Sequence, residues 1–327
     1  MTKRKAQERP LSRGRKTAVS RPRRPAARPP QAAAKTPAPP HAPAPVPAPF
    51  KNEVVLMFSG GIDSLLAAVL LAKEYDKVHL LTFKKGYLEF GLKNSLPNIE
   101  RLKALCGEDK FLPKIVNIKP LVRRFSIRSI VRDRLRYGTE VVWCVACRTT
   151  MNTAAMLYAL ENKLAAISDG SNREQIPGEK HLTGTAENYP SVVGRLKDFA
   201  LSHGVEFATP VYDFGDREER RRKLGELGFE IDYLSKDPTK TLKGMLRKDF
   251  FKRSQPLCLS GWIIHWRRNL FGVPVMQDEA KTLEFVAKKQ NTVIKKYIAA
   301  YFRKRNVDID ALVRERTEFL RTQARRG

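Results

Sequence analysis

The 327-residue sequence contains no uninterrupted apolar run of about 18 residues, and its N-terminus lacks the apolar segment of a secretory signal. These absences argue against a membrane-spanning or secreted protein, so we expect a cytoplasmic protein with no membrane partner. Acidic residues are also scarce. The 34 Asp and Glu residues face 62 Lys and Arg residues, and the formal net charge of +28 favours a polyanionic partner such as nucleic acid.

Several common ligand-binding patterns are missing as well. The sequence has neither the Walker A pattern G-x-x-x-x-G-K-[ST] nor the dinucleotide pattern G-x-G-x-x-G. It shows no RRM or KH signature and no internal repeat. These absences exclude the best-known phosphate loops, RNA-binding modules and solenoid folds.

The N-terminal segment differs in composition from the rest of the chain. The first 50 residues hold 12 of the 21 prolines and 12 Lys and Arg residues, with Glu8 as their single acid. Such a segment cannot bury enough apolar surface to fold. We therefore expect a disordered basic leader over residues 1–51, a nucleotide-binding domain over 52–235 and a mainly helical basic region over 236–327. An organellar transit peptide is the alternative interpretation of the leader.

Apolar runs alternate with helical patterns through the middle of the chain. Short apolar runs ending in Gly or Asp predict buried parallel strands, and longer runs of good helix formers predict helices between them. The predicted strands are Glu53–Phe58, Val78–Phe83, Lys114–Ile118 and Leu164–Ser168, and the predicted helices include Leu65–Tyr75 and Met151–Asn162. This order indicates an α/β fold with a Rossmann-like open parallel sheet and a helical C-terminal extension.

The loop Ser59-Gly60-Gly61-Ile62-Asp63-Ser64 follows the first predicted strand and opens the first predicted helix. Its two glycines allow a sharp turn that brings backbone N–H groups to a phosphate, and its serines add hydroxyl donors. A carboxylate beside a phosphate repels the ligand unless it orders the loop or holds Mg²⁺, so Asp63 indicates a metal-bound nucleotide. A plain strand-to-helix turn with an N-cap is the structural alternative.

An S-G-G-x-D-S loop after an apolar strand resembles the signature of the PP-loop ATP pyrophosphatases. This superfamily, whose fold is adenine nucleotide alpha-hydrolase-like, includes tRNA thiolation enzymes, sacrificial sulfur transferases and 7-cyano-7-deazaguanine synthase. The resemblance implies ATP and Mg²⁺ as ligands and adenylation of a substrate oxygen with release of pyrophosphate, followed by attack of sulfur or nitrogen. It also implies that the pyrophosphate and its Mg²⁺ are bound by Ser59, Gly60, Gly61, Asp63 and Ser64.

A second loop, Asp169-Gly170-Ser171-Asn172, follows the predicted strand Leu164–Ser168 and resembles a nucleotide-binding segment of the same superfamily. The resemblance implies that Asp169, Gly170 and Asn172 contact the nucleotide. Two positions depart from the superfamily pattern. Glu174-Gln175 stands where two aspartates are common, and Asp216 occupies an expected lysine position. We interpret the acidic residues after Asp216 as a helix N-terminus.

The cysteine pair Cys144-x-x-Cys147 has the spacing of metal and redox sites. The pair alone fits half of a zinc site, an iron–sulfur anchor, a thiol pair for sulfur relay, or two buried helix residues. The resemblance to PP-loop tRNA thiolation enzymes implies catalytic roles for Cys144 and Cys147 and a [4Fe-4S] cluster held by these two and Cys258. Zn²⁺ with His265 as a fourth ligand is the alternative, and Cys106 is expected to pack in a helix.

We therefore expect an ATP-dependent adenylating enzyme that inserts sulfur into a tRNA base or a related small molecule. Nitrogen insertion, as in 7-cyano-7-deazaguanine synthase, and a non-catalytic nucleotide- or RNA-binding protein are the alternatives. A sulfur-donor protein and a second copy of the chain are further expected partners. Arginines at helical spacing between Arg123 and Arg136 either follow an RNA backbone or solvate a helix face.

Overall fold

The computed structural model describes residues 50–138, 141–176, 186–229, 256–259 and 278–324, all within one compact unit that spans residues 48–327. Residues 1–49 of the expected leader lie outside the described residues. So do the domain boundary expected after residue 235 and His265, the alternative zinc ligand.

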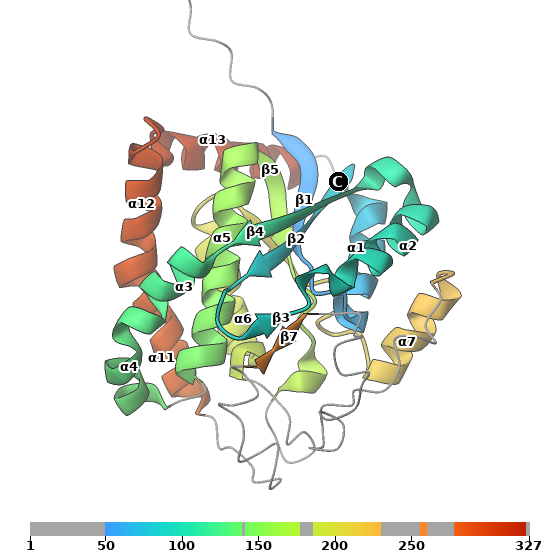
Figure 1. Ribbon diagram of the computed structural model, residues 1–327. Helices are drawn as coiled ribbons and strands as arrows, with labels where there is room; N and C mark the ends of the chain where they lie inside the picture. Colours follow the sequence, from blue (N-terminus) through green and yellow to red (C-terminus); the bar gives the residue numbers. More distant parts are fainter. Residues whose placement is uncertain (1–49, 139–140, 177–185, 230–255, 260–277, 325–327) are drawn as a thin grey trace, which may run out of the picture. The chain divides into compact units, whose positions relative to one another are not determined.

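Five parallel strands form the central sheet in the order β4–β2–β1–β5–β6 (Figure 1). The strands are β1 Lys51–Met57, β2 Lys77–Lys84, β4 Phe111–Asn117, β5 Leu164–Ser168 and β6 Glu206–Ala208. The structure confirms the predicted Rossmann-like parallel sheet. β1 lies at its centre, and Val54–Met57 are buried because helices cover both faces.

Alternate residues of β1 point into two separate apolar cores. Val55 and Met57 belong to one core, and Val54 and Leu56 belong to the other. The first core is covered by α3 Lys119–Phe125, α5 Ala146–Asn162, α6 Pro190–Leu201, α11 Glu279–Lys289 and α12 Lys295–Arg303. The second is covered by α1 Ile62–Glu74, α2 Leu96–Cys106 and α7 Arg217–Glu226. These two groups lie on opposite sides of the sheet (Figure 1).

The described C-terminal residues 278–324 are mainly helical, as predicted. α11 and α12 are continuous through the π-helical turn Gln290–Ile294, and α13 spans Ile309–Ala324. One feature departs from this pattern: β7 Leu257–Cys258 pairs antiparallel with β3 Glu89–Phe90. Two-residue strands are too short to leave a periodic signal in the sequence. None of the described helices is long and apolar enough to cross a membrane.

Arg316 anchors α13 to the amino end of the sheet. Its guanidinium is buried and donates hydrogen bonds to the carbonyl of Gly204, at 2.8 Å, and to that of Leu164 at the start of β5. The Phe50 and Phe319 rings pack beside it with their centroids 5.1 Å apart. These contacts therefore fix the last helix to the amino end of the sheet.

We expect Arg316→Ala to lower the free energy of unfolding by about 2–4 kcal/mol, because it removes buried hydrogen bonds from a charged donor and leaves a cavity. Urea denaturation followed by circular dichroism measures this change. Arg314→Ala, an exposed arginine on the same helix, is the matched control and should change stability by less than about 0.5 kcal/mol. Equal losses in the two variants would contradict the anchoring role.

Candidate functional site

The loop Ser59–Ser64 lies at the carboxyl end of β1 and leads into α1. Gly60 has a φ of +78°, a left-handed conformation that suits glycine. The Gly61 N–H donates to Ser59 Oγ at 3.3 Å, and Ser64 Oγ donates to the Gly61 carbonyl at 3.0 Å. The two serine oxygens lie 3.2 Å apart. The loop thus gathers two hydroxyls at the N-terminus of α1, where the helix dipole favours an anion.

The second loop meets the first because β5 is hydrogen-bonded to β1 and both run in the same direction. Gly170 lies against the first loop so closely that a Cβ atom there would sit 2.8 Å from the Ser64 nitrogen and 3.0 Å from the Asp63 carbonyl carbon. Asn172 Nδ2 donates to Asp63 Oδ2 at 2.9 Å. The structure therefore brings together the two loops that the sequence analysis assigned to one nucleotide site.

Asp63 is held by a buried arginine from a distant part of the chain. Arg220 in α7 is 2% exposed, and its Nε lies 2.6 Å from Asp63 Oδ1. Its Nη2 lies 2.5 Å from Glu174 Oε2. Burial raises the pKa of Asp63 above its ordinary value, and the Arg220 guanidinium opposes this rise. Arg220 thus offsets part of the cost of burying the Asp63 carboxylate.

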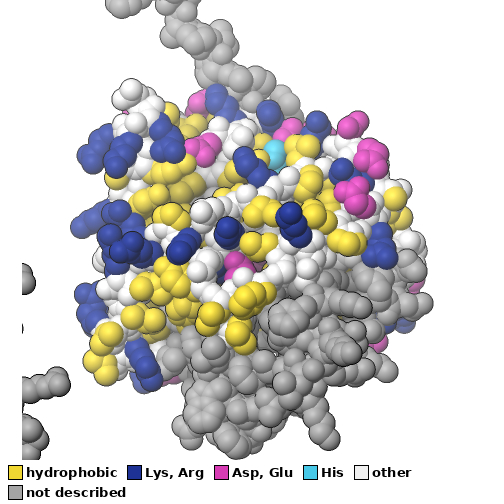
Figure 2. Space-filling model, viewed as in Figure 1, with side chains coloured by type: hydrophobic (Ala, Val, Ile, Leu, Met, Phe, Trp, Pro, Cys, Tyr) yellow, Lys and Arg dark blue, Asp and Glu magenta, His cyan; other side chains and the backbone are white. Residues whose placement is uncertain are grey.

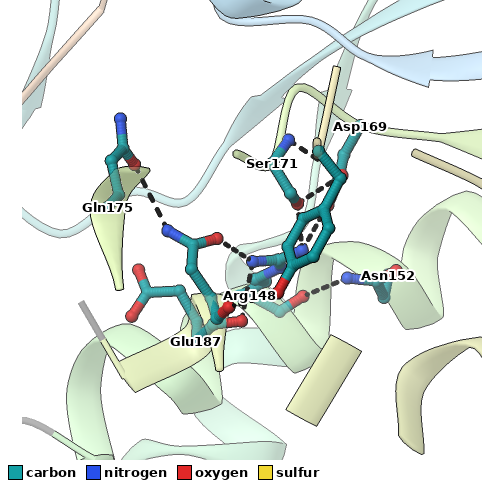
Figure 3. Close-up of polar contacts among 8 residues, drawn as sticks. Arg148, Asn152, Asp169, Ser171, Gln175 and Glu187 are labelled. Atoms are coloured by element: carbon teal, nitrogen blue, oxygen red, sulfur yellow. Dashed lines mark hydrogen bonds and ion pairs between the residues drawn. The ribbon is translucent and has the colours of Figure 1, made fainter. Parts of the chain in front are cut away.

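Arg148 supports the second loop from below (Figure 3). This buried guanidinium pairs with Asp169 Oδ2 at 2.7 Å and also donates to Ser171 Oγ. On its other side it donates to the Glu187 carbonyl at 2.8 Å and to Asn188 Oδ1 at 2.7 Å. Asp169 is therefore engaged in holding the loop, while Gly170 and Asn172 face the first loop.

The positions that depart from the superfamily pattern have structural partners here. Glu174 pairs with Arg220, as described above. Asp216 is the N-cap of α7, where its side chain accepts a hydrogen bond from the Glu219 N–H at 2.8 Å. The interpretation of this segment as an acidic helix N-terminus is confirmed.

Two of the three cysteines expected to bind a cluster lie beside one small cavity. Cys147 and Cys258 line it together with Lys85, whose Nζ lies 3.2 Å from Glu89 Oε1. Burial raises the pKa of the Cys147 thiol to about 11, and Lys85 opposes this rise. Cys144 does not line the cavity. Cys106 ends α2 and is half-buried, as expected.

Among the residues that the structure describes, no three His, Cys, Asp or Glu side chains lie close enough together to share a metal ion. A [4Fe-4S] cluster or Zn²⁺ at Cys144, Cys147 and Cys258 stays a prediction. Cys147 and Cys258 share the small cavity with the Lys85 side chain.

The sequence analysis missed Arg148, Arg220 and Lys85 as members of the site. Arg148 directly follows the cysteine pair, but its partner Asp169 lies 21 residues further along the chain. Arg220 lies in a run of charged residues, and its partner Asp63 belongs to another element. Long-range charge pairs of this kind leave no local pattern, so only the fold reveals them.

A family model matches the part of the chain that contains both loops. Residues 50–180 match the model for thiamine biosynthesis protein (ThiI). The chain is also 26% identical over 180 residues to argininosuccinate synthase from Prochlorococcus marinus (strain NATL2A). That match covers 54% of this chain and 40% of the synthase, so the chain spans well under two thirds of this relative's length.

Three solved structures resemble the chain at low overall similarity. A predicted subunit of tRNA methyltransferase from Methanocaldococcus jannaschii is 22% identical, with coverage of 54% of this chain and 90% of that chain and a TM-score of 0.31. A 4-thiouridine synthetase in complex with RNA and ATP is 17% identical, with coverages of 82% and 53% and a TM-score of 0.45. NMN synthetase from Francisella tularensis is 16% identical, with coverages of 74% and 85% and a TM-score of 0.35.

We expect Gly170→Ala to weaken the binding of Mg·ATP by roughly tenfold or more while leaving the protein folded. The new Cβ would push against the backbone of the first loop, which cannot give way as a flexible side chain can. Isothermal titration calorimetry measures the affinity. The matched control is Gly194→Ala in α6, where nothing lies within 4 Å of the added Cβ, and its affinity should equal that of the unmodified chain.

Arg220→Met should lower the free energy of unfolding by about 2–3 kcal/mol at pH 8 and by less at pH 5. Without the guanidinium the pKa of Asp63 rises further. A carboxyl group whose pKa is raised in the folded state stabilises that state at low pH, and this stabilisation is lost as the pH rises through the raised pKa. Urea denaturation at the two pH values measures both changes. Arg222→Met, an exposed control on the same helix, should behave like the unmodified chain at both; a pH-independent loss in Arg220→Met would contradict the role assigned to Asp63.

Proposed function

We propose that the chain is an enzyme of the PP-loop ATP pyrophosphatase type that adenylates a substrate oxygen with release of pyrophosphate and then inserts sulfur, with a tRNA base as the substrate. The match to the ThiI family model supports ATP-dependent sulfur transfer to tRNA at the level of the family. The observation that carries the proposal is the contact of the two loops at the carboxyl ends of β1 and β5.

The chemistry has two steps. The substrate carbonyl oxygen attacks the α-phosphorus of ATP, the bond from that phosphorus to the bridging oxygen breaks, and pyrophosphate leaves. A sulfur nucleophile then attacks the activated carbon, and the carbon–oxygen bond breaks as AMP departs with the substrate oxygen. A thiocarbonyl group remains. The enzyme's main tasks are to bind the pyrophosphate and to hold the reacting atoms in line.

The residues of the first loop suit the first task. The backbone N–H groups of Gly60 and Gly61 and the hydroxyls of Ser59 and Ser64 can donate to the β- and γ-phosphates. Asp63 would hold the Mg²⁺ that accompanies the leaving pyrophosphate. Asn172 and Arg220 fix the Asp63 carboxylate, so this ligand is oriented before the nucleotide arrives.

The thiols suit the second step, in which a sulfur nucleophile attacks the activated carbon. Lys85 follows directly after β2, and Cys147 directly precedes Arg148, which supports the second loop. The cavity with Cys147 and Cys258 therefore lies at the same edge of the sheet as the phosphate loop. A [4Fe-4S] cluster would supply an iron that carries sulfide, and Cys147 with Cys258 would then be two of its ligands. Without a cluster, Cys147 would accept sulfane sulfur from a persulfide donor, and the outer sulfur of the resulting persulfide would attack the activated carbon as AMP leaves. The Cys258 thiolate would then attack the Cys147 sulfur, release the thiocarbonyl product and leave a Cys147–Cys258 disulfide, which an external thiol reduces.

The proposal is tested by incubating the protein with Mg·ATP, an unmodified transfer RNA transcript and sulfide. We expect pyrophosphate release that depends on the RNA and thiolated nucleosides in the digested product. Asp63→Ala should slow pyrophosphate release by roughly a hundredfold or more, because the metal loses a ligand. Asp198→Ala, an exposed carboxylate on α6, is the control and should be fully active.

The other outcomes separate the alternatives. Pyrophosphate release with a small carboxylate and ammonia, but not with RNA and sulfide, would replace sulfur insertion by nitrogen insertion. ATP binding without pyrophosphate release under any condition would make the chain a binding protein. Iron and acid-labile sulfide, measured after purification without oxygen, decide between cluster and thiols: about four of each, lost in Cys147→Ala but kept in Cys106→Ala, would establish the cluster.

A further inference from the structure

Exposed Lys and Arg side chains gather on the helices of one face of the sheet, away from the phosphate loop's own helix. We name this region the α3–α4–α12 surface, where α4 spans Ile130–Tyr137. Its exposed cations are Arg123, Arg124, Arg128, Arg134, Lys295, Lys296, Arg303 and Lys304. In Figure 2 the Lys and Arg side chains gather along the edge where Figure 1 places these helices. Within the described part of the chain, none of the eight has a carboxylate ion-pair partner.

The acidic residues of this surface are already neutralised. Asp133 is buried and accepts from Lys289 Nζ at 2.5 Å. Glu284 accepts from Arg136 at 2.5 Å and from the Tyr137 hydroxyl at 3.0 Å. Residues 119–137 contain seven Lys and Arg but only one acid, and residues 295–305 contain five and none. The positive potential is therefore not cancelled locally, which is a property of surfaces that bind polyanions.

The cations are presented by a rigid arrangement of helices. The Phe125 and Tyr297 rings join α3 to α12 edge-on, with centroids 5.4 Å apart, and the Arg124 guanidinium lies 5.1 Å from the Tyr297 ring centroid. The Lys289–Asp133 pair joins α11 to α4. Cations held at fixed positions can pair with the regularly spaced phosphates of a nucleic-acid backbone, whereas a surface that is only solvated has no need of fixed positions.

An open depression of about 680 Å³ lies within this surface, along α4 and the turn before it. Its lining includes Arg128, Arg132 and Arg136 together with Val131 and Leu135, which are 71% and 85% exposed. Guanidinium planes and apolar side chains are the groups on which unstacked nucleobases rest. Two largely exposed apolar side chains, grouped with arginines in one depression, are typical of a binding surface.

We propose that the α3–α4–α12 surface is the docking site for RNA, with phosphates on its cations and an unpaired base in the depression on α4. The inference rests on the proposed function in one respect, because the docked RNA would be the substrate presented to the phosphate loop. The two arise from different residues, so they can fail separately.

Binding to an unmodified transfer RNA transcript is measured without ATP, by fluorescence anisotropy of the labelled RNA at several salt concentrations, on the full chain. The variant Arg128→Ala/Arg134→Ala/Lys295→Ala/Lys296→Ala removes two cations from each half of the surface. We expect it to bind at least about tenfold more weakly and to show a salt slope shallower by roughly two to four. Its Mg·ATP affinity and melting temperature should match those of the unmodified chain, because all four side chains are exposed and unpaired.

The control Lys73→Ala/Arg222→Ala removes exposed cations from α1 and α7, on the opposite face of the sheet, and is compared with Lys295→Ala/Lys296→Ala.

Equal RNA affinity in the four-fold variant and the unmodified chain would overturn the docking site and leave the proposed function standing. Absence of RNA binding by the unmodified chain, with Mg·ATP still bound, would overturn both the docking site and the RNA substrate. Loss of binding to phosphatidylserine vesicles, with RNA binding unchanged, would reassign the surface to lipid.

Discussion

The site depends on the close approach of Gly170 to the backbone of Asp63 and Ser64. A parallel sheet brings the ends of β1 and β5 to one edge, but the two loops can only touch if one of them lacks a side chain at the contact. Glycine makes that approach possible, and the hydrogen bond from Asn172 to Asp63 then joins the loops. The phosphate loop owes its shape to this second loop as much as to its own glycines.

Buried arginines connect the elements that the chain order keeps apart. Arg148 joins α5 to the second loop, Arg220 joins α7 to the first, and Arg316 joins α13 to β5. Burying a guanidinium carries a large desolvation cost, which is acceptable only where several acceptors converge on it. Two of the three arginines have carboxylate partners, while the partners of Arg316 among the described residues are carbonyls, and burial lowers its pKa to about 10. The charge pairs therefore specify geometry at the site, and carbonyls suffice where only anchoring is needed.

The sequence was sufficient to predict the fold and both loops, because these leave local signals. Val54–Met57 form an apolar run that ends in glycines, and Leu164–Ser168 was predicted with the bounds that the structure has. The partners of those loops were not predictable, since Arg220 and Asp63 are distant in sequence and ordinary in their local context. The cysteine motif shows the limit in another way: spacing grouped Cys144 with Cys147, and only the family resemblance added Cys258. The fold lines one cavity with Cys147 and Cys258 but not with Cys144. The short β3–β7 pair that carries Cys258 has no periodicity to reveal it.

The strand order affects when the site can form during folding. β1 and β5 are neighbours in the sheet but are separated by more than 100 residues of chain, which include β2, β4 and the helices between them. Closing so long a loop costs conformational entropy before the strand contacts can offset it, so we expect β1 and β5 to pair late in folding. During synthesis the phosphate loop emerges long before the residues that shape it. We therefore expect a nascent or truncated chain that ends before β5 to lack the second loop's contacts with the first loop, and with them a complete site for ATP.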